Sequence, residues 1–242
     1  MGKLRVHNIE AQTGTNVDLG AAGDVVTFAS DSIQTNLYKD SGANTILQYD
    51  GAGTLSNVNS LLGGNGPKLI TTSSGDSLTN VDFITGIDST YDSYMFVMIN
   101  LNPNATEMFA VNFSIDSLSN FVNKTSSAPY AYHYENNSSA DLGYWAAGDL
   151  ANSASNMYLG EHIGADADES LSGILYLYAP SSTTYYKQYQ FTTQGCVDAG
   201  NPLSTHYFGG GYCQTTSAIN SVRFLLSGGG AWSGTVKMYG IS

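Results

Sequence analysis

Apolar and polar residues alternate in many short stretches between residues 68 and 242. Tyr94, Phe96 and Met98 are separated by single residues, and so are Ile174, Tyr176 and Tyr178. A period of two places alternate side chains on opposite faces of a β-strand. This pattern predicts strands at 68–72, 80–85, 93–101, 107–115, 129–135, 155–162, 172–179, 184–193 and 205–214.

Turn-forming residues separate these stretches, as in Asn102-Pro-Asn and Pro180-Ser-Ser. No long stretch has the 3.6-residue period of an amphipathic helix, and only residues 149–156 would fit a short helical turn. Many short strands joined by polar turns are typical of β-sandwiches and jelly rolls. The predicted fold class is therefore all-β, with a jelly-roll β-sandwich at residues 68–242.

The last two predicted strands, near residues 219–226 and 235–241, flank three consecutive glycines, Gly228 to Gly230. Glycine adopts the positive φ angles that a tight chain reversal needs. Since a strand at the end of a chain frays unless it is paired, the pattern predicts a C-terminal hairpin that closes the sandwich.

Residues 1–62 have a different character. Short alternating stretches at 13–28 are echoed weakly at 41–55, and large apolar residues are few. Alone, such a segment buries too little surface to offset its backbone entropy. It is therefore disordered, or it folds by pairing with other copies of itself; we favour the second, a β stem in an oligomer. Residues 63–67, Gly-Gly-Asn-Gly-Pro, predict a hinge before the jelly-roll head at 68–242. A phosphate-binding loop is the alternative for such a glycine-rich segment, but its spacing is absent.

Charged residues form only 12% of the chain, about half the usual share. The net charge is −12, from 20 acidic and 8 basic residues. This balance argues against a nucleic-acid partner, which requires clustered Lys and Arg. No run of 18 apolar residues and no signal-peptide pattern occur, so we expect no membrane insertion and synthesis in a cytoplasm.

Enzymatic chemistry is not indicated. The Gly-x-Ser-x-Gly motif of a nucleophile elbow is absent, and the four histidines are scattered over different predicted strands. The few glutamates show no spacing that would pair two carboxylates for glycoside hydrolysis. We therefore expect a protein without catalytic residues or cofactor.

An acidic loop is the best candidate for a metal site. Asp166, Asp168 and Glu169 offer oxygen ligands at close spacing, but the spacing of an EF-hand is not met. A solvated acidic loop is the favoured interpretation, with no metal bound.

Tyrosine is abundant, with 17 residues. Tyr130, Tyr132 and Tyr134 share one face of a predicted strand, and other tyrosines crowd two later strands. Two interpretations are open: packing in a core or subunit interface, or stacking of flat rings against sugars. The candidate binding residues are Tyr130, Tyr132, Tyr134, Tyr185, Tyr186, Tyr207 and Tyr212.

The two cysteines, Cys196 and Cys213, flank a loop and would meet if the strands beside it were antiparallel neighbours. A disulfide there would add roughly 3 kcal/mol of stability in the chain-entropy model. A reducing cytoplasm and an oxidising medium outside the cell favour opposite outcomes, so a bridge and two thiols both remain open.

Several phrases resemble the C-terminal jelly-roll domains of bacteriophage tail-fibre-like and minor structural proteins, especially those of marine and cyanobacterial phages. They are Val-Asp-Phe-Ile-Thr-Gly-Ile-Asp-Ser-Thr-Tyr-Asp-Ser-Tyr at 81–94, Tyr-Ala-Tyr at 130–132, and the segments 171–177, 219–224 and 232–241. The phrase at 13–24 resembles the stem segments that precede such domains. The resemblance implies a homotrimer with a thin β stem and a jelly-roll head displayed on the virion.

The leading hypothesis is a non-enzymatic virion surface protein: a trimeric fibre or spike whose head binds a host-surface receptor, chiefly carbohydrate. Residues 1–62 would anchor it to other virion proteins. The alternative is a capsid decoration or head-fibre protein anchored to the major capsid protein. A polysaccharide depolymerase is disfavoured because no carboxylate pair is evident.

Overall fold

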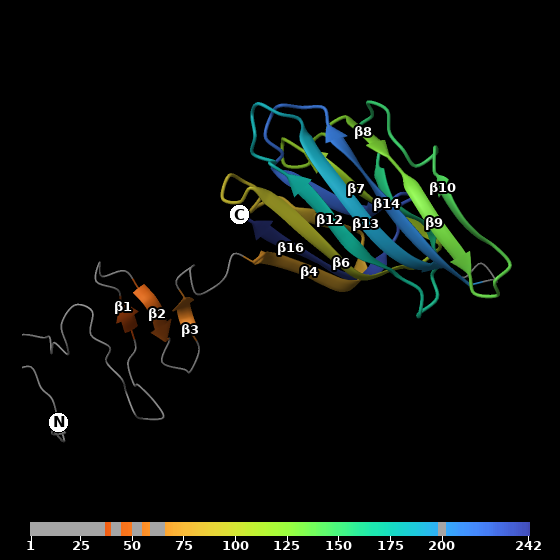
Figure 1. The fold of residues 1–242 in the computed structure, drawn as a ribbon, viewed down its shortest axis with the longest axis horizontal. Coiled ribbons are helices and arrows are strands. Elements are labelled where there is room, and N and C mark those ends of the chain that lie inside the picture. The colour runs from red at the N-terminus through yellow and green to blue at the C-terminus, as the bar shows by residue number, and fades with distance from the viewer. Residues whose placement is uncertain (1–36, 40–44, 50–54, 59–65, 198–201) are drawn as a thin grey trace, which may run out of the picture. The chain divides into compact units, whose positions relative to one another are not determined.

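The computed structural model describes residues 66–197 and 202–242 in full, together with the backbone of three short N-terminal strands (Figure 1). The chain divides into two units, Met1–Gly64 and Asn65–Ser242, and this division falls within the predicted hinge 63–67. In the first unit, β1 (Leu37–Lys39), β2 (Thr45–Tyr49) and β3 (Leu55–Val58) form an antiparallel sheet in that order. The rest of the predicted stem and anchor at 1–62 lies outside the described residues.

The second unit contains two antiparallel sheets. The larger has nine strands in the order β10-β9-β14-β13-β12-β6-β16-β4, with β8 also paired to β14. Its strands are β4 (Lys68–Leu78), β6 (Ser93–Pro103), β8 (Lys124–Ser127), β9 (Pro129–Tyr134), β10 (Ala140–Tyr144), β12 (Leu171–Tyr178), β13 (Lys187–Val197), β14 (Leu203–Cys213) and β16 (Trp232–Ile241).

The smaller sheet has four strands in the order β11-β7-β15-β5. These strands are β5 (Asn80–Phe83), β7 (Glu107–Ser114), β11 (Met157–Ile163) and β15 (Ser221–Leu226). No helix occurs in the described part of the chain, so the all-β prediction is confirmed and the helical turn proposed for 149–156 is wrong.

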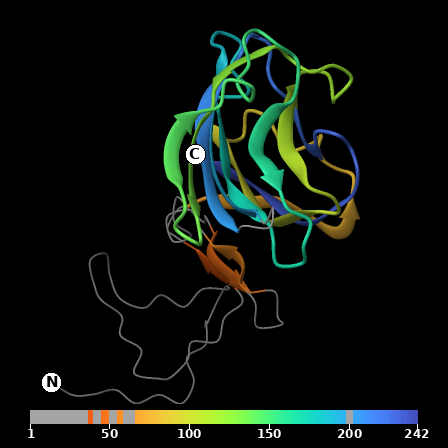
Figure 2. The same cartoon turned by 90° about the vertical axis from the view of Figure 1, so that its right-hand side faces the viewer.

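The two sheets pack face to face as a β-sandwich, seen from two directions in Figures 1 and 2. Aromatic rings from opposite sheets meet in the core. Phe96 on β6 lies 5.5 Å from Phe224 on β15, and Trp232 on β16 meets Phe109 on β7 edge to face at 5.5 Å. The core is therefore supplied from both sheets. The alternating residues Tyr94, Phe96 and Met98 of β6 face it, whereas Ile174, Tyr176 and Tyr178 of β12 face outward.

Two strands were not predicted. β8 carries polar residues at both faces of a four-residue segment, and β10 is an exposed edge strand with its apolar Leu142 facing solvent. Neither shows the apolar-polar alternation of a half-buried strand, because neither buries a regular apolar face. Both are held by pairing with neighbouring strands, which periodicity does not record.

The predicted C-terminal hairpin is wrong in its pairing. β15 pairs with β7 and β5 in the small sheet, whereas β16 pairs with β4 and β6 in the large one. The glycine turn, with Gly229 and Gly230 at positive φ, carries the chain from one sheet to the other. Each strand has an apolar face that must be buried. Burial is achieved equally well when the strands pair side by side in one sheet and when they pack against each other from two sheets, so the pattern could not distinguish the two arrangements.

The four-stranded sheet is too narrow to cover the whole inner face of the nine-stranded sheet. β11 forms one edge of the small sheet and contacts β13 and β14, and β9 and β10 form the end of the large sheet to the right in Figure 1. The residues of β9 are half-buried or exposed on both faces, whereas inward residues of β6 are buried. The inner face of the large sheet is therefore partly open at this end.

Candidate functional site

A row of six aromatic rings lies at the open end of the sandwich. Tyr134, Tyr132 and Tyr130 project from the same side of β9, with centroid separations of 5.6 and 6.2 Å. Tyr130 lies directly across from Tyr207 on β14, and their rings are 6.3 Å apart. Trp145 extends the row from Tyr207, with ring centroids 5.7 Å apart. The predicted common face of the three β9 tyrosines is thus present, and Tyr207 joins it.

Beyond Trp145 the row ends on β11. Trp145 stacks on Tyr158 with centroids 5.5 Å apart and planes 30° from parallel. The row thus begins on the large sheet and ends on the small one. Gly143 on β10 leaves room for Tyr130, because a Cβ there would lie 2.8 Å from the Tyr130 hydroxyl oxygen. The rings are therefore set by three strands and one loop of the same fold.

A groove of about 350 Å³ lies beside these rings, within the size range of small-ligand sites. Aromatic and aliphatic residues form most of its wall, and a carboxylate, an imidazole and a hydroxyl contribute the polar groups. Its lining residues are Tyr130, Tyr132, Glu161, His162, Val197, Leu203, Thr205 and Tyr207. We refer to this site as the aromatic groove.

Irregular pairing of β11 brings Glu161 and His162 into the same groove. Gly160 lies opposite Phe109 but Ile163 opposite Glu107, so β11 carries an extra residue between them. Such a bulge bends a strand and re-aims its side chains, whereas successive residues of a regular strand face opposite ways. His162 has φ of +50°, an uncommon conformation for a residue with a side chain. The backbone is thus distorted at the polar wall of the groove.

The polar groups of the groove lie close together. His162 Nε2 is 3.2 Å from Glu161 Oε1, and both side chains reach solvent. Burial raises the pKa of the Tyr207 hydroxyl, and the nearby Glu161 carboxylate raises it further. Tyr207 therefore stays neutral and retains its proton as a hydrogen-bond donor. The residues that line the groove include acidic and neutral groups but no lysine or arginine.

The remaining predicted tyrosines lie elsewhere. Tyr186 stacks on Tyr212 with centroids 5.7 Å apart and planes 7° from parallel. Tyr185 is 71% exposed in the loop before β13. Tyr212 lies opposite Gln188, an exposed residue of β13, so this pair belongs to the outer side of the large sheet. The structure thus separates these three from the four other predicted tyrosines, which lie in the row.

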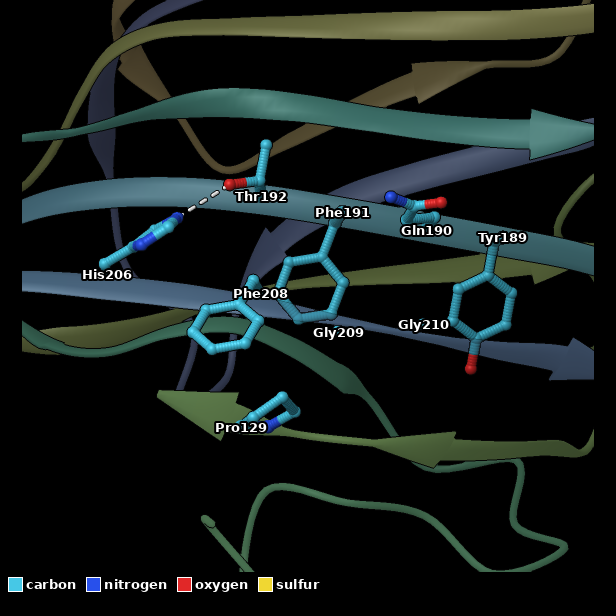
Figure 3. Close-up of a pocket in the computed structure, with 9 residues that line it drawn as sticks. All are labelled: Pro129, Tyr189, Gln190, Phe191, Thr192, His206, Phe208, Gly209 and Gly210. Carbon is cyan, nitrogen blue, oxygen red and sulfur yellow. Dashed lines mark hydrogen bonds between the residues drawn. The ribbon is translucent and has the colours of Figure 1, made fainter. Parts of the chain in front are cut away.

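An open hollow of about 610 Å³ lies on the outer side of β13 and β14 (Figure 3). Thr192 Oγ1 and His206 Nε2 are hydrogen-bonded at 2.8 Å, and the imidazole contacts the Phe208 ring at 5.1 Å. Gly209 and Gly210 bring no side chain into the hollow. Its lining residues are Pro129, Tyr189, Gln190, Phe191, Thr192, His206, Phe208, Gly209 and Gly210. The aromatic groove is the better binding site, because five of the six rings in the row beside it are half-exposed.

The sequence left a disulfide between Cys196 and Cys213 open, and the register of β13 and β14 does not bring the two residues together within one chain. Cys196 pairs with Ser204 near one end of the β13–β14 hairpin, and Cys213 pairs with Lys187 near the other. Nine residues of strand separate the two positions, about 30 Å, whereas bridged Cα atoms lie within about 7 Å. Cys196 is exposed and Cys213 is buried, on opposite faces of the sheet. The strands are antiparallel neighbours as supposed, but their register keeps the thiols apart.

Cys213 belongs to a buried row with two lysines. Lys124 on β8 and Lys187 on β13 lie directly across from it on either side, and all three side chains are fully buried. Lys124 Nζ donates to Asn112 Oδ1 at 2.9 Å and to the Val122 carbonyl at 3.1 Å. Burial lowers the pKa of Lys124 to about 8 and raises that of Cys213 to about 12. The sequence contained no signal for this cluster.

The acidic loop is not the fully solvated segment that was predicted. Glu169 is buried, and its Oε2 accepts a hydrogen bond from the Asp166 backbone N–H at 2.9 Å. Asn102 Nδ2 donates to the carbonyls of Asp166 and Glu169. Glu169 therefore stabilises the loop from inside. Within the described residues, no group of three or more His, Cys, Asp or Glu side chains is arranged to hold a metal ion.

Sequence reasoning missed the aliphatic and hydroxyl residues Val197, Leu203 and Thr205 of the groove wall, and four further residues of the site. Trp145 and Tyr158 extend the ring row, and Glu161 and His162 line the groove. Trp145 is one of only two tryptophans, which could have drawn attention to it. The bulge that turns Glu161 and His162 toward the groove leaves no recognisable pattern in the sequence.

Comparisons with known proteins return nothing: no family model matches the chain, and no curated protein or solved structure is similar to it. Over the part of the chain that the structure describes, no helix is long and apolar enough to cross a membrane.

Proposed function

We propose that the chain is a non-enzymatic virion surface protein whose β-sandwich binds host-surface carbohydrate in the aromatic groove. The observation that carries the proposal is the row of six rings at the open end of the sandwich, five of them half-exposed and Tyr207 buried, beside polar groups able to hydrogen-bond. Flat aromatic faces suit the apolar faces of sugar rings, and polar groups beside them suit hydroxyls.

The groove supports binding rather than hydrolysis. Glu161 is the one carboxylate among its eight lining residues. Glycoside hydrolysis generally uses two carboxylates about 5–9 Å apart, one of them an acid. A single carboxylate is instead suited to accept hydrogen bonds from adjacent hydroxyls. The proposed ligand is therefore an uncharged glycan, because an anionic one would meet the Glu161 carboxylate in a groove lined by no lysine or arginine.

Placement on a phage virion rests on the resemblance of the sandwich segments to phage tail-fibre-like domains. In this proposal the head presents the groove to the host, and residues 1–62 attach the protein to other virion proteins. Capsid decoration would use the same head without requiring glycan binding. Binding to glycans and competition for adsorption therefore separate the two.

The test is a titration of the full chain with surface polysaccharides of candidate hosts, followed by Trp145 fluorescence and by calorimetry. We expect Tyr132→Ala to weaken binding at least tenfold, because it removes the half-exposed ring from the middle of the β9 row. The matched control is Tyr185→Ala, which removes an exposed ring outside the groove and should leave affinity within twofold of wild type. Trp145→Phe should abolish the fluorescence change.

A second measurement tests the biological role. Added chain should compete with virions for adsorption to host cells, and Tyr132→Ala chain should compete less well. If no host glycan binds, or if Tyr132→Ala binds as tightly as wild type, the proposal is wrong. Glycan binding without competition would contradict the attachment role alone.

A further inference from the structure

The outer face of the large sheet is largely apolar over three adjacent strands, β16, β6 and β12, and Leu69 of β4 lies beside them. Cross-strand pairing places Tyr239, Met95 and Tyr176 in one row. A second row contains Lys237, Val97 and Ile174. Directly paired residues of antiparallel strands share a face. The outer apolar face comprises Leu69, Ser93, Met95, Val97, Ile99, Ile174, Tyr176, Tyr178, Lys237, Tyr239 and Ile241.

No member of this face is buried. Leu69 is 56% exposed, and Ile99 and Tyr178 are each 37% exposed. The rings of Tyr176 and Tyr178 stack 6.1 Å apart with planes 10° from parallel, which makes a flat, preformed surface. Within the described sandwich the face is thus largely apolar and not covered by another strand or loop.

β6 shows the anomaly most clearly. Tyr94, Phe96 and Met98 point into the core and are almost fully buried. The alternate residues Met95, Val97 and Ile99 point outward and are apolar as well. In an antiparallel sandwich the outward positions are normally polar, and near-continuous apolar strands are typical of sheets covered on both faces. This pattern indicates that another layer covers the outer face.

The size of the face suits an interface. Three strands about 4.8 Å apart and seven residues of about 3.3 Å each span roughly 14 by 23 Å. That projection, roughly 300 Å², is in the range of the largest apolar patches on single-chain proteins, which are often functional. An isolated exposed leucine would carry no such implication.

The distribution of charge on the chain favours a second copy of the same chain as the partner that covers this face. The chain carries 20 acidic and 8 basic residues, so two copies repel one another over most of their surfaces. The outer apolar face contains no carboxylate and one cation, Lys237, and Asp76 lies only at its border, in a hollow shared with Ile99. A basic partner would be recognised through carboxylates, which the face lacks. Copies of this acidic chain can approach closely here.

We propose that the outer apolar face is the interface through which the sandwiches of several copies of this chain associate. The aromatic groove lies on the inner side of the same sheet, beside β9 and β14, so association would leave it open. The interface and the groove are thus independent of one another.

The experiment measures the mass of the full chain in solution by light scattering and sedimentation. Wild type should be a single oligomer at micromolar concentration. Val97→Glu and Tyr176→Glu place a carboxylate at the centre of the face and should reduce the mass to that of the 25.6 kDa monomer. The milder Tyr176→Ser should raise the dissociation constant at least tenfold, and thermal unfolding verifies that each variant is folded.

The matched control is Leu142→Glu. Leu142 is 69% exposed and lies opposite Ala131 on β9, at the far end of the same sheet. It adds the same charge outside the face and should leave the oligomer intact. A monomeric wild type overturns the proposal, and so does an oligomer that survives both glutamate variants, which would place association on residues 1–64. Glycan titrations of the same variants report on the groove separately.

Discussion

The inner face of the large sheet has a covered centre and an open end that share one pattern and differ in environment. Phe96 and Leu175 alternate with outward residues on β6 and β12, and both are fully buried beneath the small sheet. Tyr130 and Tyr132 alternate in the same way on β9, yet they stay half-exposed. The period of two predicts which side chains share a face. It does not predict whether that face is covered.

The difference follows from the unequal size of the sheets. Four strands cover the centre of a nine-stranded sheet and stop at β11. Beyond the edge of the small sheet, the inner face of the large sheet carries tyrosines. The ring of a tyrosine packs on its neighbours while its hydroxyl reaches water. The binding surface is thus an extension of the core face into solvent. β14 crosses this boundary, from buried Cys213 to half-buried Leu203.

The largest expected effect on stability comes from comparing a residue in the covered centre of the sheet with one at its open end. Phe96→Ala should lower the free energy of unfolding by about 3–5 kcal/mol, because it leaves a cavity among packed rings. Tyr130→Ala should cost less than half of that, since its ring is half-exposed in the native state. Urea unfolding measures both. Equal losses would show that the covered centre and the open end are equally packed.

The next effect concerns the edge of the covered region. Thr193 on β13 donates its hydroxyl proton to the Leu159 carbonyl on β11, joining the two sheets beside the groove. Thr193→Val keeps the shape but leaves that buried carbonyl without its donor, so we expect a loss of about 1–3 kcal/mol. Glycan affinity should fall as well if β11 shifts. Unchanged stability would mean that the sheets are held without this bond.

A pH titration tests the covered end of β14. Lys124 has a pKa of about 8 in the folded chain, below its ordinary 10.5, so the unfolded state binds more protons between these values. Stability should therefore rise as the pH rises through 8, by about 1 kcal/mol between pH 8 and 9. Above pH 9 the raised pKa of Cys213 acts in the opposite direction and the gain should level off.

The control for this titration is Lys124→Met, which removes the titrating amine. Its stability should depend less on pH between 8 and 9, and the groove should bind glycan as in wild type. A rise of the same size in the variant would assign the effect to other groups, such as Lys187, whose pKa burial also lowers.

The smallest effect is expected on the surface of the small sheet. Arg223 on β15 makes two hydrogen bonds of 2.7 Å to the carboxylate of Asp82 on β5. Because the pair is solvent-exposed, Asp82→Ala should cost no more than about 1 kcal/mol, and less at high salt. Urea unfolding at low and high salt measures this. A loss approaching that of Phe96→Ala would contradict the contrast between core and surface.

The sequence predicted the site only in part. The spacing of Tyr130, Tyr132 and Tyr134 predicts their common face, since alternation is local. Glu161 and His162 could not be assigned, because an extra residue in β11 reverses the facing of the residues after it. Tyr186 and Tyr212 stack on one another outside the groove, so abundance of tyrosine alone does not identify members of one site.

Alternation along the chain therefore determined that this protein is all-β, where most strands lie and which residues of a strand share a face. It did not determine which face of β12 is buried, because Ile174, Tyr176 and Tyr178 face outward and Leu175 and Leu177 face the core. Tertiary structure decided the rest. It placed β15 and β16 in different sheets, kept Cys196 and Cys213 about nine strand positions apart, and left the β9 tyrosines uncovered. The physical reason is range: side-chain alternation is set by the local backbone, whereas pairing partner, register and cover depend on residues far away in the sequence.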